Sequence, residues 1–245
     1  MENAAYIGLS RQMTLRRELD IVANNIANAD TNGFKVEQLM VGTEIGQRAR
    51  NDAIRPSASF VLDKGVGRDF TQGSVKQTGR ALDFAIEGEG AFFRVQSGTG
   101  EAYTRDGGFT TNAEGVLTTK QGLPVLGDGG EIVLDPERGP ASVAPDGTVT
   151  QQGEPVGRLT AVRFDTLSVL QKSGDGLYRN TSNARPVDAP DAQIRQGMLE
   201  SSNVNTLLEI TNLIEISRAY ERVTKMIENT NDLSRRSVER LGRVS

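Results

Sequence analysis

The chain has 245 residues, a formal net charge of −4 at pH 7, 36% hydrophobic and 5% aromatic residues, and neither cysteine nor histidine. These numbers exclude disulfides, thiolate nucleophiles, Cys/His zinc sites and catalytic triads built on imidazole. The mild charge, without a lysine- and arginine-rich block, argues against electrostatic capture of nucleic acid. No stretch is long and apolar enough to span a bilayer, and no cleaved signal peptide is expected. These features alone indicate a cytoplasmic location unless another export route exists.

The N-terminal segment, residues 1–35, is predicted to carry a helix with a narrow apolar seam. From about residue 3 to 29 it has no proline and one glycine. Four apolar residues recur at alternating spacings of four and three, the period of a coiled-coil seam: Leu15, Leu19, Val22 and Ile26. Asn32 and Gly33 follow, and a glycine with positive φ can end a helix. We therefore place the helix-ending turn at Asn32 and Gly33.

The middle of the chain, residues 71–195, is predicted to be an all-β domain. Apolar residues alternate along 82–87, the period of a half-buried strand, which puts Asp83 and Glu87 on its solvent face. Asp-Gly pairs lie between short apolar runs, as in hairpin turns, at 106–107, 128–129, 146–147 and 175–176. Residues 36–70 lack a clear period and are predicted to be an extended connector.

The C-terminal segment, residues 196–245, is predicted to carry a second, unusually long helix, with Ser202 or Asn203 as its N-cap. Its apolar residues keep three-four spacing at Leu213, Ile216, Tyr220, Val223 and Ile227. The predicted fold is therefore mainly β with long terminal α-helices. An antiparallel β-domain is inserted between N- and C-terminal helices, which pair as a coiled-coil-like helical domain. Because a narrow seam needs a partner, we also expect contacts with other subunits.

Asparagines gather on both predicted helices, and two interpretations are open. They form either a polar helix face near a frayed end or amide contacts between packed helices, which bond without the charge that would repel identical subunits. Their recurrence at both ends of the chain favours the second interpretation. The predicted assembly interface is Leu15, Leu19, Val22, Asn24, Asn25, Ile26, Asn28, Asn203, Asn205, Leu213, Ile216, Tyr220, Val223 and Ile227.

No catalytic, cofactor-binding or metal-binding residues are predicted. The Gly-x-Gly at 88–90 lacks the third glycine of a dinucleotide fingerprint. Asp83, Glu87 and Glu89 could be considered as carboxylates for glycoside hydrolysis, but a solvated strand edge explains them better. We therefore expect no enzyme activity and no cofactor.

The chain resembles the rod and hook family of flagellar axial proteins nearly end to end. The resemblance rests on ANNIANADTNGFK at 23–35, TQGSVKQTGRALDFAIEGEGAFFRV at 71–95, YTRDGGFTTNAEGVLTTKQGLPVLG at 103–127 and GMLESSNVNTLLEITNLIEISRAYERVTKM at 197–226. The opening YIGLSRQMTLRRELD and the modest length favour a proximal rod member of the family over a distal rod member. A glycan-binding or glycan-cleaving β-domain protein is the alternative from another class.

The resemblance implies a structural part of the bacterial flagellum rather than an enzyme. Such a subunit polymerises through its terminal helices into the hollow rod of the basal body, which crosses the periplasm and transmits torque from motor to hook. It implies copies of itself, adjacent proximal and distal rod subunits and the flagellar type III export apparatus as partners, with export that needs no cleaved signal peptide. Nucleic acid, membrane insertion and small-molecule substrates are not expected.

Overall fold

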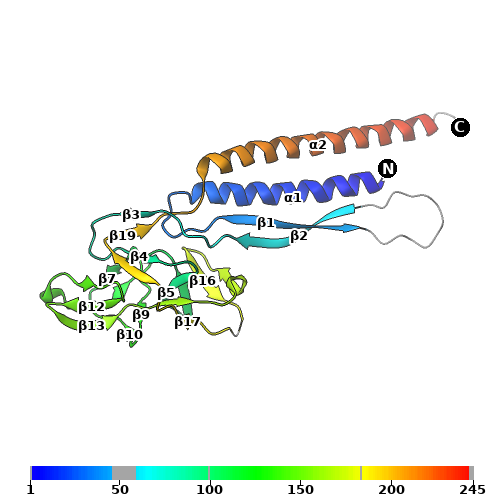
Figure 1. Ribbon diagram of the computed structural model, residues 1–245. Helices are drawn as coiled ribbons and strands as arrows, with labels where there is room; N and C mark the ends of the chain where they lie inside the picture. The colour runs from blue at the N-terminus through cyan, green and yellow to red at the C-terminus, as the bar shows by residue number, and fades with distance from the viewer. Residues whose placement is uncertain (1, 46–58, 99, 183, 243–245) are drawn as a thin grey trace. The chain divides into compact units, whose positions relative to one another are not determined.

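The computed structural model describes residues 2–45, 59–98, 100–182 and 184–242, and the chain divides into two compact units (Figure 1). The helical unit contains the residues up to Ala27, Glu37–Arg68 and the residues from Asn205 onward. The β unit contains Asn28–Val36 and Asp69–Val204. The chain therefore crosses between the units after residues 27, 36, 68 and 204. Residues 46–58 of the expected connector, and the last three of the expected C-terminal helix, lie outside the described residues.

The helical unit is built on two long helices, α1 (Glu2–Ala27) and α2 (Thr206–Gly242). Both were expected from the three-four spacing, and α2, with 37 residues, is longer than most globular helices. Its N-cap, however, is Asn205, whose Oδ1 accepts a hydrogen bond from the Leu208 N–H at 3.2 Å. The predicted caps Ser202 and Asn203 are wrong, because both precede that turn and their side chains bond elsewhere.

The two helices run antiparallel and in contact within the helical unit (Figure 1). Gly8 of α1 faces Ile227 of α2 so closely that a Cβ at Gly8 would lie 2.9 Å from Ile227 Cγ1. One turn further along α1, Gln12 Nε2 donates to Thr224 Oγ1 at 3.0 Å. The expected pairing of the terminal helices is therefore confirmed.

A hairpin of β1 (Glu37–Ile45) and β2 (Ser59–Arg68) completes the helical unit and packs on α1 (Figure 1). This is the region expected to be an extended connector. Its strands pair antiparallel, with a register shift between Leu39 and Val41. A bulge of this kind breaks the alternation of apolar and polar residues, so the period of two that signals a strand is lost from the sequence.

The β unit consists of short, mostly antiparallel strands. They are β3 (Val75–Gln77), β4 (Phe84–Glu87), β5 (Ala91–Ser97), β6 (Gly100–Thr104), β7 (Thr110–Thr111), β8 (Leu117–Thr118), β9 (Val125–Gly127), β10 (Gly130–Glu131), β11 (Ser142–Val143), β12 (Thr148–Gln151), β13 (Glu154–Arg158), β14 (Ala161–Arg163), β15 (Leu170–Lys172), β16 (Leu177–Asn180), β17 (Val187–Asp188), β18 (Gln193–Gln196) and β19 (Met198–Glu200). The largest sheet has the order β10-β9-β5-β6-β16-β15, and β14 pairs with β5 and β17. Short 3-10 helices lie at Pro136–Arg138 and Leu167–Val169. The expected all-β character is confirmed.

Buried side chains on both sides of β5 form the core of the β unit. Phe93 and Val95 belong to a larger apolar cluster, in which the Phe93 and Phe109 rings meet edge to face at 5.2 Å. Phe92 points into a second, smaller cluster with Tyr178, at 5.8 Å between ring centroids. A strand buried on both faces explains the apolar run AFF at its start.

Three of the four expected Asp-Gly hairpin turns are confirmed, at 128–129, 146–147 and 175–176. The fourth, at 106–107, is wrong: it lies between β6, which pairs with β5 and β16, and β7, which pairs with β8. Gly107 is needed there for a different reason. A Cβ on it would lie 1.8 Å from the Phe84 carbonyl oxygen, so a side chain cannot fit.

Candidate functional site

The apolar seam expected from the sequence is buried or partly buried within the helical unit, where α1 packs against α2, β1 and β2. Leu15 and Val22 are buried, with 1% and 7% of their surfaces exposed, and Leu19 and Ile26 are partly buried. The five positions predicted on α2 are all partly buried: Leu213, Ile216, Tyr220, Val223 and Ile227. These residues therefore already have intrachain neighbours, and their part in contacts between subunits stays a prediction.

A different set of apolar residues on the same helices faces outward, and the sequence analysis missed it. We call this set the outer stripe: Tyr6, Leu9 and Met13 on α1, and Leu207, Ile210 and Ile214 on α2, with exposures from 41% to 76%. In each helix the three residues follow i, i+3, i+7 spacing and so share one face. The spacing was visible in the sequence. It was overlooked because the stronger seam pattern runs along the same helices.

Asn25, one of the predicted asparagines of α1, is buried and bonded within the helical unit. Its side chain is 1% exposed. Its Nδ2 donates to the Glu37 carbonyl at 2.8 Å and to Glu209 Oε2 at 3.1 Å, while its Oδ1 accepts from the Glu37 N–H at 3.0 Å. Both amide hydrogens are thus used within the chain. The Glu37 carboxylate in turn pairs with Arg68 Nε at 2.8 Å. We call Asn25, Glu37, Arg68 and Glu209 the first node.

The other four predicted asparagines lie in different places. Asn24 is exposed on α1, and Asn28, just past its end, accepts from Thr31 Oγ1 at 3.2 Å. Asn205 caps α2. Asn203 lies in the β unit, where its Oδ1 accepts from the Val36 N–H at 2.8 Å and its Nδ2 donates to the Asp69 carbonyl at 2.9 Å. Asn25 and Asn203 therefore have intrachain hydrogen bonds, and the part of these asparagines in contacts between subunits stays a prediction.

A buried ionic cluster lies beside Asn203 in the β unit. Lys35 Nζ is 2.6 Å from Glu200 Oε1, and Arg105 Nε is 2.8 Å from Glu200 Oε2, with all three side chains 1% exposed. Lys35 also donates to the Thr71 carbonyl at 2.6 Å. We call Lys35, Arg105, Glu200 and Asn203 the second node. Burial lowers the pKa of Lys35, and the Glu200 carboxylate opposes that shift.

Gly33 brings the segment after α1 onto this node. Its φ of +66° is in the left-handed region, as expected for the turn, although α1 itself already ends at Ala27. Its N–H donates to the Glu200 carbonyl at 2.8 Å. A Cβ there would lie 2.5 Å from the backbone carbon of Arg105. Gly33 is therefore required both by its conformation and by the close approach of another chain segment.

The carboxylates considered for glycoside hydrolysis do not form a catalytic pair. Asp83 was expected on a solvent-facing strand edge, but it is 1% exposed, with Arg80 Nη1 3.6 Å from its Oδ1. The expectation fails because Asp83 bridges Gly108 and its carbonyl accepts from Gly197, so chain covers it on both sides. Glu87 is exposed and paired with Arg195 at 2.8 Å, and Glu89 is exposed.

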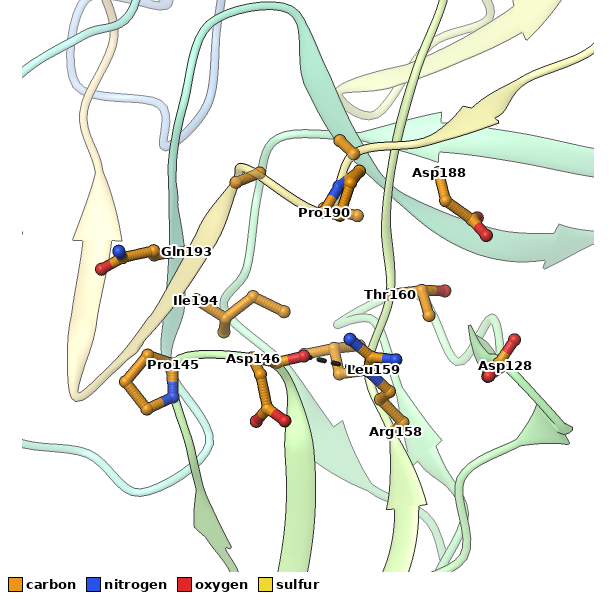
Figure 2. A pocket seen from close by; sticks show the side chains of 13 residues that line it. Asp128, Pro145, Asp146, Arg158, Leu159, Thr160, Asp188, Pro190, Gln193 and Ile194 are labelled. Atoms are coloured by element: carbon orange, nitrogen blue, oxygen red, sulfur yellow. Dashed lines mark hydrogen bonds between the residues drawn. The ribbon is translucent and has the colours of Figure 1, made fainter.

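A pocket of about 370 Å³ opens on the β unit (Figure 2). Leu159 and Ile194 are among its apolar lining residues, and three exposed aspartates also line it: Asp128 and Asp146 in turns and Asp188 in β17. Hydrogen bonds from Thr148 lower the pKa of Asp146, so this carboxyl stays ionised and is a poor general acid. Among the residues described by the structure, no group of three acidic side chains could hold a metal ion, and no helix could cross a membrane.

Three family profiles match the chain. Residues 6–35 match "Flagella basal body rod protein", residues 85–151 match "Flagellar hook protein FlgE/F/G D1 domain" and residues 195–240 match "Flagellar basal body rod FlgEFG protein C-terminal". The first profile contains Asn25 and Lys35, the second contains Arg105, and the third contains Glu200, Asn203 and Glu209.

Whole-length relatives agree with these profiles. The chain is 59% identical to the flagellar basal-body rod protein FlgF of Caulobacter vibrioides, over 100% of both chains. It is 36% identical to FlgF of Mesorhizobium japonicum over 99% of both. The flagellar basal-body rod protein FlgG of Bacillus subtilis is 31% identical over 95% of this chain and 97% of its own.

Proposed function

Because the chain belongs to the FlgF family of flagellar basal-body rod proteins, and is a structural component of the rod, we propose that it assembles with its neighbours through the outer faces of its terminal helices. The single observation that carries this proposal is the outer stripe. Leu207 of α2 is 76% exposed and Met13 of α1 is 67% exposed. Apolar side chains gathered on one helix face are a common mark of a protein–protein contact.

The mode of assembly follows from the surface that is left after the helices pair. The seam residues Leu15 and Val22 are already buried within the chain, so they offer little apolar area to a neighbour. The outer stripe can gain that burial, at roughly 1.5–3 kcal/mol per large apolar side chain. Contacts that repeat head to tail without closing build a filament such as a rod.

The chain associates with other rod components in the flagellar basal body, as its family does. More specifically, its proposed partners are copies of itself and the adjacent proximal and distal rod subunits, in the part of the rod that crosses the periplasm. Export through the flagellar type III apparatus without a cleaved signal peptide is part of the same proposal. In this rod the subunit transmits torque from motor to hook.

We also propose that the chain is not an enzyme. Its family is structural. Of the acidic side chains considered for catalysis, Glu87 is paired with Arg195, and Asp83 is buried beside Arg80. The glycan-cleaving alternative is not favoured by the comparisons.

The assembly proposal is tested in a strain that lacks this rod protein. Leu207→Lys with Ile214→Lys places two charges on the outer stripe, and Glu221→Lys with Glu228→Lys, two exposed positions of the same helix, is the matched control. We expect the stripe variant to be absent from purified basal bodies and the strain to be non-motile, whereas the control is incorporated. Normal incorporation of the stripe variant would contradict the proposal.

A further inference from the structure

We infer that the two nodes are mechanical clamps: each holds together, within its own unit, the chain ends where that unit is entered and left, so that load is shared among the four chain segments. The inference rests on the proposed function, because only a load-bearing subunit requires its chain ends to be fixed together within each unit. Its residues are positioning residues: they act by fixing the backbone segments through which load is carried.

Each crossing is a single peptide strand. The chain crosses between the units after residues 27, 36, 68 and 204. A peptide strand has two soft backbone dihedrals per residue, so a crossing can rotate unless its flanking residues are fixed. Covalent continuity alone therefore leaves the ends of the crossing segments free to move against one another within each unit.

In the helical unit, the first node connects all four chain ends. Asn25 lies two residues before the first crossing and bonds both the N–H and the carbonyl of Glu37, the first residue after the second crossing. The Glu37 carboxylate binds Arg68, the last residue before the third crossing. Asn25 also binds Glu209, and the Glu209 N–H donates to the carbonyl of Asn205, the first residue after the fourth crossing.

In the β unit, the second node does the same. Asn203, next to the last residue before the fourth crossing, bonds Val36, which precedes the second crossing, and Asp69, which follows the third. The Asp69 N–H also donates to the Val36 carbonyl at 3.1 Å. Lys35 and Gly33 join the segment that follows the first crossing to Glu200.

The interactions in the nodes are better suited to fixing the positions of backbone segments than to stabilising the fold. Buried ion pairs lose much of their Coulomb energy to desolvation, and apolar residues of similar volume can stabilise a fold equally well. Hydrogen bonds, by contrast, are directional and weaken steeply when donor and acceptor are displaced. In the second node, three buried charged side chains bind one another and so connect the segments next to the crossings: Lys35, Arg105 and Glu200. Directional hydrogen bonds of this kind hold the segments that they join in fixed positions.

The test uses Asn203→Ala, which removes every bond of that side chain, and Asn203→Asp, which keeps the acceptor for the Val36 N–H and removes the two donor hydrogens. The matched control is Asn112→Ala. Asn112 Oδ1 accepts from the Glu114 and Val116 N–H groups in an exposed turn of the same unit, away from the crossings.

Amide hydrogen exchange of the purified full chain is the first measurement. In Asn203→Ala we expect the Val36 amide to exchange about tenfold faster, since its hydrogen-bond acceptor is gone. We expect the Val36 rate to be unchanged in Asn112→Ala, and the amides of β5 to be unchanged in both variants. An unchanged Val36 rate in Asn203→Ala would overturn the clamp.

Swimming of complemented deletion strains in plain and in methylcellulose-thickened medium is the second measurement. We expect both Asn203 variants to enter basal bodies and to swim in plain medium, but to lose more speed than Asn112→Ala under viscous load. Equal losses would overturn the clamp.

Two other outcomes concern the Asn203 variants themselves. If they are absent from basal bodies although their β unit melts normally, Asn203 acts in assembly. If their β unit does not melt cooperatively, Asn203 acts in folding. Both outcomes overturn the clamp. Absence of the unmodified protein from basal bodies would instead refute the proposed function.

Discussion

Lys35 Nζ lies 2.6 Å from Glu200 Oε1, although the two residues are 165 positions apart in the sequence and each side chain is 1% exposed. Glu200 is shared with a second buried cation, Arg105, at 2.8 Å. One carboxylate thus pairs with two cations, and all three side chains are almost fully buried. This arrangement joins the segment that follows α1 to the strand that precedes α2. We therefore expect replacement of Glu200 to lower the stability of the β unit strongly.

Glu200→Gln is expected to lower the free energy of unfolding of the β unit by about 3–5 kcal/mol, because it leaves Lys35 and Arg105 buried without a counter-charge. Chemical denaturation followed by circular dichroism measures the change. The control is Glu154→Gln, which breaks the exposed Arg138–Glu154 pair at 2.7 Å and is expected to cost less than about 1 kcal/mol. Similar losses in the two variants would show that the buried pair has no special weight.

Gly33→Ala is expected to destabilise the β unit by more than the roughly 1–2 kcal/mol of a strained positive φ, because the new methyl group would also press on the Arg105 backbone. Gly122→Ala is the matched control. Gly122 has a φ of +83°, and a Cβ there would meet nothing within 4 Å. Thermal melts of both variants give the difference. Equal shifts of the melting temperature would show that the close approach of the Arg105 backbone to Gly33 adds nothing to the cost.

The stability of the β unit is expected to fall as the pH rises from 10 to 12. Burial, together with the neighbouring Glu101 carboxylate, raises the pKa of Tyr103 from 10.0 to about 12. In that range the unfolded chain releases the tyrosine proton while the folded chain keeps it, so unfolding becomes easier by up to about 2 kcal/mol. Tyr103→Phe should flatten this part of the profile, as urea unfolding at each pH will show. If stability falls equally with pH in the unmodified protein and in Tyr103→Phe, Tyr103 is not the cause of the fall.

The seam between α1 and α2 is expected to hold the helix pair together. Ile216→Lys with Val223→Lys should cost several kcal/mol, since partly buried apolar contacts are lost and two charges must be solvated. We expect a smaller far-ultraviolet helical signal with a normal melting transition of the β unit. Arg222→Ala with Glu228→Ala, on exposed positions of the same helix, should leave the signal unchanged. An intact helical signal in the lysine variant would show that the seam is dispensable.

The large elements were predictable because their signals are local. The three-four spacing of Leu15 to Ile26 and of Leu213 to Ile227 specifies the two helices, and Gly33 has the expected positive φ. The β1–β2 hairpin was not found, because the bulge between Leu39 and Val41 removes the period that reveals a strand.

The nodes could not be predicted, because they depend on contacts between distant segments. Asn25, Glu37 and Glu209 are polar residues in three separate stretches, and nothing local tells that they meet. The asparagine pattern was noticed, but it admits both interchain and intrachain partners, and the intrachain partners could not be identified from the sequence. Asp83 was placed on the solvent face for the same reason: the Gly108 and Gly197 segments that cover it come from elsewhere in the chain.

The most direct test of assembly through the terminal helices is site-specific cross-linking within intact basal bodies. The chain has no cysteine, so Leu207→Cys or Met13→Cys gives a single labelling site for a photoreactive maleimide. Glu114→Cys, in an exposed turn of the β unit, is the comparison site. We predict that Leu207→Cys and Met13→Cys form covalent products with rod proteins, including this chain itself. Helix positions that give no interchain product, while the Glu114 position does, would contradict the account.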